Sequence, residues 1–245
     1  MRIQFTSDLH LEERPKTTFE TFLEHGRCPV LALLGDICPS THPNFKPFLE
    51  WCSERWETIL YVPGNVELFE SNPAWSIAES LSHLIGVTSP YKNIHVLYRD
   101  KFMSSDGLLV LGCAFWSCIP DAPKSHRKRH LEDVEWVRAA TKETTLPVLV
   151  LTHYGPTRWV QNELVLENPA KSPVNHEIEV LLRSPVLVWI FGHLHGYIEY
   201  TKTWNSADGA GSDVLLVSNG YGSHHRRDAI LAIRVPGGVI PAGTP

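Results

Sequence analysis

The stretch Leu60–Phe69, LYVPGNVELF, begins as an apolar strand and ends in a tight turn that carries Asn65 at its tip and Glu67 two residues later. An apolar run of this length, ended by proline and glycine, is typical of a buried strand in an α/β protein. Open α/β sheets bind their ligands beyond the carboxyl ends of such strands. Asn65 is therefore a polar side chain at a position where ligands bind.

The same order of apolar strand and polar residue recurs on either side of this stretch. Short apolar runs alternate with amphipathic segments of helix length, which indicates a β-α-β order. Strands are expected at Ile3–Ser7, in VLALLGD (30–36) and in TILYVPGN (58–65). Helices are expected around Thr17–His25, in NFKPFLEWCSERW (44–56) and in NPAWSIAESLSHLIG (72–86).

The middle of the chain departs from this order. Strand candidates at 94–100, 101–105 and 108–117 are closely spaced, with Ser-Asp-Gly as hairpin chemistry, so antiparallel pairing is expected there. Helices at His126–Glu143 and near 174–184 precede two more strands, in VLVLTHYGP (148–156) and VLVWIFGHLHG (186–196). The tail predicts antiparallel strands in YIEYT (197–201), DVLLVSNGYG (213–222) and AILAIRV (229–235).

Composition narrows the class of protein. With 245 residues, 43% hydrophobic and 20% charged, the sequence predicts one folded domain over residues 1–245. A net charge of −5 without a long basic tract argues against a nucleic-acid partner. No signal-peptide pattern and no apolar run near the roughly 18 residues of a membrane helix are present, so we expect a cytoplasmic protein with no membrane contact. The five cysteines form no CxxC pair and indicate neither a disulfide framework nor a zinc knuckle.

Five expected strands end in groups that bind metals. These are two carboxylates, one amide and four imidazoles: Asp8, His10, Asp36, Asn65, His153, His193 and His195. This donor set suits borderline ions such as manganese, iron or zinc. Seven ligands are too many for one tetrahedral ion and suit two ions about 3.5–4 Å apart that share a carboxylate. Each motif alone has an ordinary alternative, since capping aspartates, turn residues and core histidines are common.

The five motifs SDLH, LLGD, PGNVE, THYGP and FGHLH, in this order, resemble the calcineurin-like metallophosphoesterase family, whose pattern is D-x-H, G-D, G-N-H-[D/E], a lone His and G-H-x-H. The resemblance implies a four-layer αββα sandwich of two mixed β-sheets flanked by helices. It also implies hydrolysis of phosphoester bonds. On this pattern Asp8, His10 and His195 hold one ion, Asn65, His153 and His193 hold the other, and Asp36 bridges them.

The chain departs from the family pattern at Val66, where the family has a histidine that donates a proton to the leaving oxygen. Losing a positioned general acid costs roughly 10²–10⁴ in rate. We expect residue 66 at the mouth of the site, with Glu67 retained as an acid that has no imidazole left to orient. Two interpretations stay open, a recent or engineered substitution and a reaction that no longer needs this proton. Tyr154, His224 and His225 are the candidates for another proton source.

Three functional hypotheses follow. The first is a dinuclear-metal hydrolase of a phosphodiester or an activated monoester of a small molecule, attenuated by Val66. The second is a dinuclear centre used for other chemistry on a small organic substrate, and the third is a metal-binding pseudoenzyme. Trp116 at a strand end has two interpretations, contact with an organic leaving group and closure of the core. Other tryptophans in loops indicate an aromatic or apolar part of the substrate, and the positive charge of the expected ions favours an anionic one.

Overall fold

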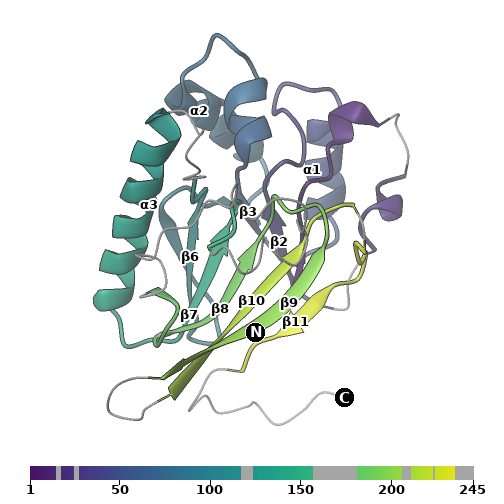
Figure 1. Cartoon of the computed structure of the whole chain (residues 1–245). Helices are drawn as coiled ribbons and strands as arrows, with labels where there is room; N and C mark the ends of the chain where they lie inside the picture. The colour runs from purple at the N-terminus through teal and green to yellow at the C-terminus, as the bar shows by residue number, and fades with distance from the viewer. Residues whose placement is uncertain are drawn as a thin grey trace.

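The structure, a computed structural model, consists of two β-sheets that face each other with helices on the outside (Figure 1). This confirms the αββα sandwich. The residues that it describes are 1–14, 18–24, 28–116, 124–156, 181–205, 211–222 and 224–234.

The first sheet has five strands in the order β11-β1-β2-β3-β4. Neighbours among β1 to β4 run parallel, and β11 pairs antiparallel with β1. Because β1, β2 and β3 are parallel, their carboxyl ends, and the polar residues that follow, meet at one edge. The strands are β1 (Arg2–Thr6), β2 (Val30–Leu34), β3 (Thr58–Val62), β4 (Ile94–Val96) and β11 (Ile230–Ala232).

The second sheet has six strands in the order β5-β6-β7-β8-β10-β9. The strands β6, β7, β8 and β10 are parallel, whereas β5 and β9 pair antiparallel at the two edges. The strands are β5 (Asp100–Met103), β6 (Leu109–Cys113), β7 (Val148–Thr152), β8 (Val186–Phe191), β9 (Tyr197–Asn205) and β10 (Gly211–Asn219).

The direction of the side chains alternates along the buried strands, and this divides the apolar core into three layers. On β2, Leu31 and Leu33 pack with the helices outside the first sheet, whereas Ala32 and Leu34 pack between the sheets. Successive side chains of a strand point to opposite faces, so a strand covered on both sides reads as a continuous apolar run. The central strands are apolar throughout for this reason.

In the described part of the chain, three α-helices cover the outer faces: α1 (Phe45–Ser53), α2 (Ile77–Thr88) and α3 (Lys124–Lys142). The helix α3 runs along the six-stranded sheet in Figure 1 and contributes Val134 and Val137 to its core. A capping box between Ser76 and Glu79 fixes the start of α2. The short elements are the 3₁₀ turns η1 (Leu11–Glu13) and η2 (Phe19–Thr21) and the π-helix η3 (Val66–Glu70).

Some local expectations were wrong. In the described part of Thr17–His25 the chain forms only the 3₁₀ turn η2. The strand β4 joins the first sheet parallel to β3, so antiparallel pairing in the middle of the chain is confined to β5 and β6. The tail strand β11 pairs with β1 in the other sheet. The helix expected near 174–184 lies largely outside the described residues, and among those residues no helix has the length and apolar character to span a membrane.

Candidate metal centre

The seven predicted ligands lie in loops that leave strands at one edge of the sandwich. Loops after β1, β2 and β3 carry ligands from the first sheet, and loops after β7 and β8 carry them from the second. Backbone hydrogen bonds join the loops within each set, from Gly192 N–H to the carbonyl of His153 at 2.9 Å and from Asp8 N–H to that of Gly35 at 3.0 Å. Between the two sets, the His193 N–H donates to Asp8 Oδ2 at 2.9 Å. The ligands are Asp8, His10, Asp36, Asn65, His153, His193 and His195.

These side chains form two overlapping groups. In the buried group, Asp8, Asp36, His153 and His193, each residue offers a ligand atom within 4.8 Å of all the others. The exposed group has the same property and consists of Asp8, His10 and His195. The amide oxygen of Asn65 lies 3.1 Å from His153 Nε2, which places Asn65 beside the buried group.

Asp8 therefore belongs to both groups. Asp36, the predicted bridge between the two ions, belongs to the buried group, so its role as the bridge stays a prediction.

Two unpartnered atoms fit metal ions at this centre. Asp8 Oδ1 and His193 Nδ1 are buried and have no hydrogen-bond partner among the described residues. Asp8 Oδ2, in contrast, accepts hydrogen bonds from the Ser7 hydroxyl and from His193 N–H. A buried polar atom without a partner costs free energy unless a ligand satisfies it, and these donor types are those that divalent transition metals prefer.

The buried group contains side chains of opposite charge. Burial disfavours the charged form of both Asp36 and His153, but the attraction between them outweighs it, lowering the pKa of Asp36 and raising that of His153. Their Oδ2 and Nε2 atoms are 3.4 Å apart. Burial raises the pKa of Asp8 and lowers that of His193 to about 3. His193 is thus a neutral imidazole, the form that coordinates metals.

Backbone conformation at the centre is unusual. The residues Asp8, His10, Asp36, His193 and His195 all have positive φ, between 43° and 69°. Residues other than glycine rarely adopt this left-handed region, and they cluster at functional sites when they do. The fold thus holds five predicted ligands in strained conformations.

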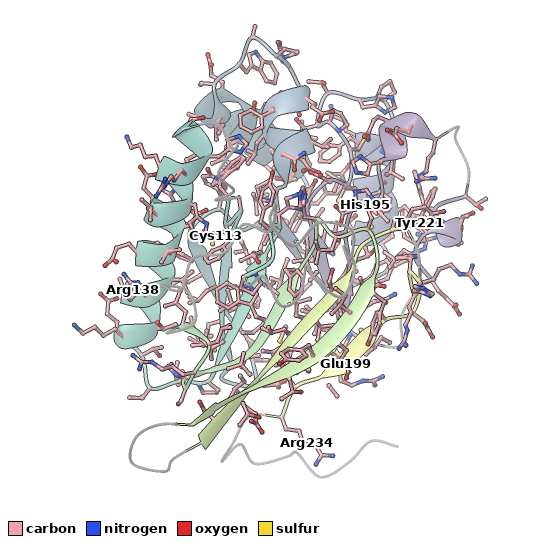
Figure 2. The ribbon with its side chains drawn as sticks, viewed as in Figure 1. Cys113, Arg138, His195, Glu199, Tyr221 and Arg234 are labelled. Atoms are coloured by element: carbon pink, nitrogen blue, oxygen red, sulfur yellow. The ribbon has the colours of Figure 1, made fainter. Side chains whose placement is uncertain are left out.

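Glycines allow the ligand loops to approach one another. A Cβ on Gly64 would lie 2.3 Å from Asp36 Oδ1, and one on Gly35 would lie 2.6 Å from His153 Nδ1. From the tail of the chain, a Cβ on Gly222 would lie 2.2 Å from the carbonyl oxygen of His195. Figure 2 shows this proximity, with Tyr221 beside His195 and Glu199 and Arg234 toward the opposite end of the sandwich.

Glu67 has no imidazole to orient, but it has other partners. It is fully buried, and it accepts hydrogen bonds from four backbone N–H groups and from the Tyr61 hydroxyl. Burial and the nearby Asp36 raise its pKa, while these donors lower it. Its contacts need no histidine at position 66.

The place of Val66 at the mouth of the site stays a prediction. The residue begins the π-helix η3 and is 2% exposed. Its N–H donates to Asp36 Oδ1 at 2.9 Å. Val66 therefore positions a ligand through its backbone, while its side chain offers no proton.

The three proposed proton sources differ in position. The Tyr154 hydroxyl donates to Asn65 Oδ1 at 3.0 Å, and the Tyr154 ring lies 4.3 Å from that of His193. His225 Nε2 instead lies 3.2 Å from the Thr6 hydroxyl, and His224 is exposed. The structure thus brings Tyr154 to the centre but makes no hydrogen bond from either tail histidine to a described ligand.

Several supporting residues were missed by the sequence analysis. The Ser7 hydroxyl binds Asp8, and Glu12 Oε1 accepts from His10 Nδ1 at 2.8 Å. The hydrogen bond to Glu12 raises the pKa of His10 to about 9. Carboxylates that hold metal-binding histidines are common, so a glutamate two residues after a ligand was a usable signal. For Ser7 no pattern in the sequence was available.

Comparisons with known proteins agree with this fold and show the family. The family model for calcineurin-like phosphoesterases matches residues 1–197, so the chain belongs to the calcineurin-like phosphoesterase family. An uncharacterized protein of Acanthamoeba polyphaga mimivirus is 24% identical, with 93% of this chain and 94% of that protein covered. The crystal structure of a phosphopantetheinyl hydrolase from Mycobacterium tuberculosis has a TM-score of 0.64 at 17% identity, covering 90% of this chain and 89% of that one.

Proposed function

We propose that the protein is a hydrolase of phosphoester bonds in small molecules and uses two ions of manganese, iron or zinc. The observation that carries this proposal is the pair of overlapping ligand groups that share Asp8, with unpartnered atoms at Asp8 and His193. Asp36, Asn65, His153 and His193 would hold one ion, and Asp8, His10 and His195 the other. When bound, such ions stabilise charge on phosphoryl oxygens and lower the pKa of water.

The chain's own residues restrict the substrate. Val66 offers no proton, and burial raises the pKa of Tyr154, whose hydroxyl keeps its proton to donate to Asn65. The leaving group must then depart as an anion, which favours phosphodiesters and monoesters with acidic leaving groups. The mycobacterial protein of similar fold is a phosphopantetheinyl hydrolase, which supports a phosphoester with an organic part.

Hydrolysis by the manganese-loaded protein tests this function. We expect turnover of an aryl phosphodiester and much slower turnover of an alkyl one. Val66→His should raise the alkyl rate by about 10-fold or more, toward the 10²–10⁴ of a general acid, and change the aryl rate little. Metal content is measured in both proteins, because the substituted position is buried.

Two outcomes would contradict the proposal. If wild-type protein with two bound ions cleaves neither ester, the centre performs other chemistry on a small organic molecule, and product analysis with such substrates follows. If it binds no manganese, iron or zinc, the metal-dependent function is wrong.

A further inference from the structure

Glu67 lies at the junction between the two turns that carry Asp36 and Asn65. We propose that Glu67 is a positioning residue, whose buried carboxylate holds these two turns together and so sets the affinity of the buried ligand group for its ion. This inference rests on the metal-dependent function proposed above. It gives the acid of the PGNVE motif a role that does not depend on a histidine before it.

Each oxygen of the carboxylate joins different parts of the chain. Oε2 accepts from Gly64 N–H at 2.8 Å and from Asp36 N–H at 3.0 Å, so it links the turn after β3 to the turn after β2. Oε1 accepts from Ile37 N–H and from the Tyr61 hydroxyl, both at 2.8 Å. The carboxylate thus spans 31 residues of sequence to reach the backbone of a predicted metal ligand.

All of these partners are donors. A carboxylate accepts hydrogen bonds at both oxygens, whereas a carboxyl or carboxamide group must place a hydrogen on one side. A carboxamide would turn an N–H toward a backbone N–H donor at either oxygen position, inside a fully buried site. A protonated carboxyl would do the same at Oε2, whereas at Oε1 its O–H would find an acceptor in the Tyr61 hydroxyl. The surroundings of Glu67 therefore exclude glutamine as an equivalent side chain.

The same contacts support the strained backbone at Asp36. The residue has a φ of 52° and follows Gly35 at 80°. The N–H groups of three successive residues from Asp36 onward converge on Glu67, an arrangement that forms a concave site for an anion. Without that anion, the left-handed conformation of Asp36 would lose the contacts that stabilise it.

Asp36 is thereby held from both sides by the π-helix η3. Glu67 accepts from its backbone N–H, and the N–H of Val66 donates to its side-chain Oδ1. Both contacts come from adjacent residues, so a shift of Glu67 would move the two together. Outer contacts of this kind typically change metal affinity by 10- to 100-fold when removed.

The test is titration of metal-free protein with Mn²⁺ by calorimetry, which needs no substrate. Glu67→Gln keeps the shape but replaces one acceptor by a donor. We expect a 10- to 100-fold loss of affinity at the buried group and an affinity within threefold of wild type at the exposed group. Glu70→Gln is the matched control, because Glu70 lies in the same π-helix with an exposed side chain, and it should leave both affinities unchanged.

A uniform loss at both groups, or no loss at either, would overturn the inference. If Glu67→Gln does not fold, Tyr61→Phe decides, because it removes a single donor and keeps the carboxylate. That variant should lower the Mn²⁺ affinity of the buried group alone by about threefold to tenfold, and unchanged affinity would overturn the inference. Wild-type protein that binds no Mn²⁺ would instead remove the proposed function, which keeps the two failures distinct.

Discussion

The buried and exposed ligand groups of the centre are built in different ways. His153 is fully buried, its Nδ1 is 2.8 Å from the carbonyl of Leu34, and Asp36 beside it is held by Glu67 and Val66. His195 is 54% exposed, and its Nε2 lies 3.9 Å from Asp8 Oδ1. The protein therefore fixes the buried group before any ion arrives, whereas in the exposed group Glu12 holds His10 and an ion would have to order His195. Two ions at such a centre should bind with unequal affinity.

The largest expected effect comes from removing one histidine of each group in metal-free protein. His153→Ala leaves Asp36 buried without its opposite charge, and breaking a buried pair costs about 3–5 kcal/mol. His195→Ala should cost less than about 1 kcal/mol, because the His195 side chain is 54% exposed and solvent screens its long contact with the buried Asp8. Urea unfolding gives both values, and equal losses would show that the two groups do not differ in this way.

A smaller effect is expected at Gly222, which supports the exposed group from the tail of the chain. The Cβ of Gly222→Ala would meet the backbone of His195, which must shift, at a cost of about 1–3 kcal/mol. Unfolding measures the loss, and titration with Mn²⁺ should show weaker binding at the exposed group only. Weaker Mn²⁺ binding at the buried group instead would contradict the conclusion that the two ligand groups are built in different ways.

Gly86→Ala is the control for this substitution. Gly86 lies inside α2, and a Cβ there would meet nothing within 4 Å. The same chemical change should stabilise the protein by about 0.5–1 kcal/mol, since alanine loses less backbone entropy in a helix.

The smallest effect concerns pH and the same tail segment. Burial, with a contribution from Arg227, lowers the pKa of His225 to about 4. A depressed histidine pKa means that the folded state favours the neutral ring, so its stability is fully present above about pH 6.5 and is lost as the pH falls toward 4. After allowance for solvent screening, His225→Asn should reduce the loss of stability between pH 7.5 and 5 by about 1 kcal/mol. Identical pH slopes in urea unfolding would refute this.

The sequence predicted the features that local pattern determines. Continuous apolar runs identified the central strands, and the polar residues that end them, such as Asp36 and His153, did meet at one edge. The sheet partners of β4 and β11 could not be predicted, because apolar pattern marks a strand without saying which neighbour it pairs with.

The contacts of Glu67 and the burial of Val66 could not be predicted from the sequence, for a different reason. Glu67 binds backbone N–H groups, and every residue except proline has one, so no side-chain pattern marks its partners. Val66 lies in a π-helix, a rare element whose register differs from that of an α-helix. A motif compared position by position gives the residue type at position 66 but not how deeply that residue is buried.

The left-handed backbone of the ligands connects metal supply to the amount of protein in a cell. Each such residue costs on the order of 1 kcal/mol or more, so the five together approach the 5–15 kcal/mol that keeps a typical domain folded. Ions that bind only the folded state offset this strain by mass action. Chains made when metal is scarce would unfold more often and meet proteases more often, so their abundance should follow metal availability.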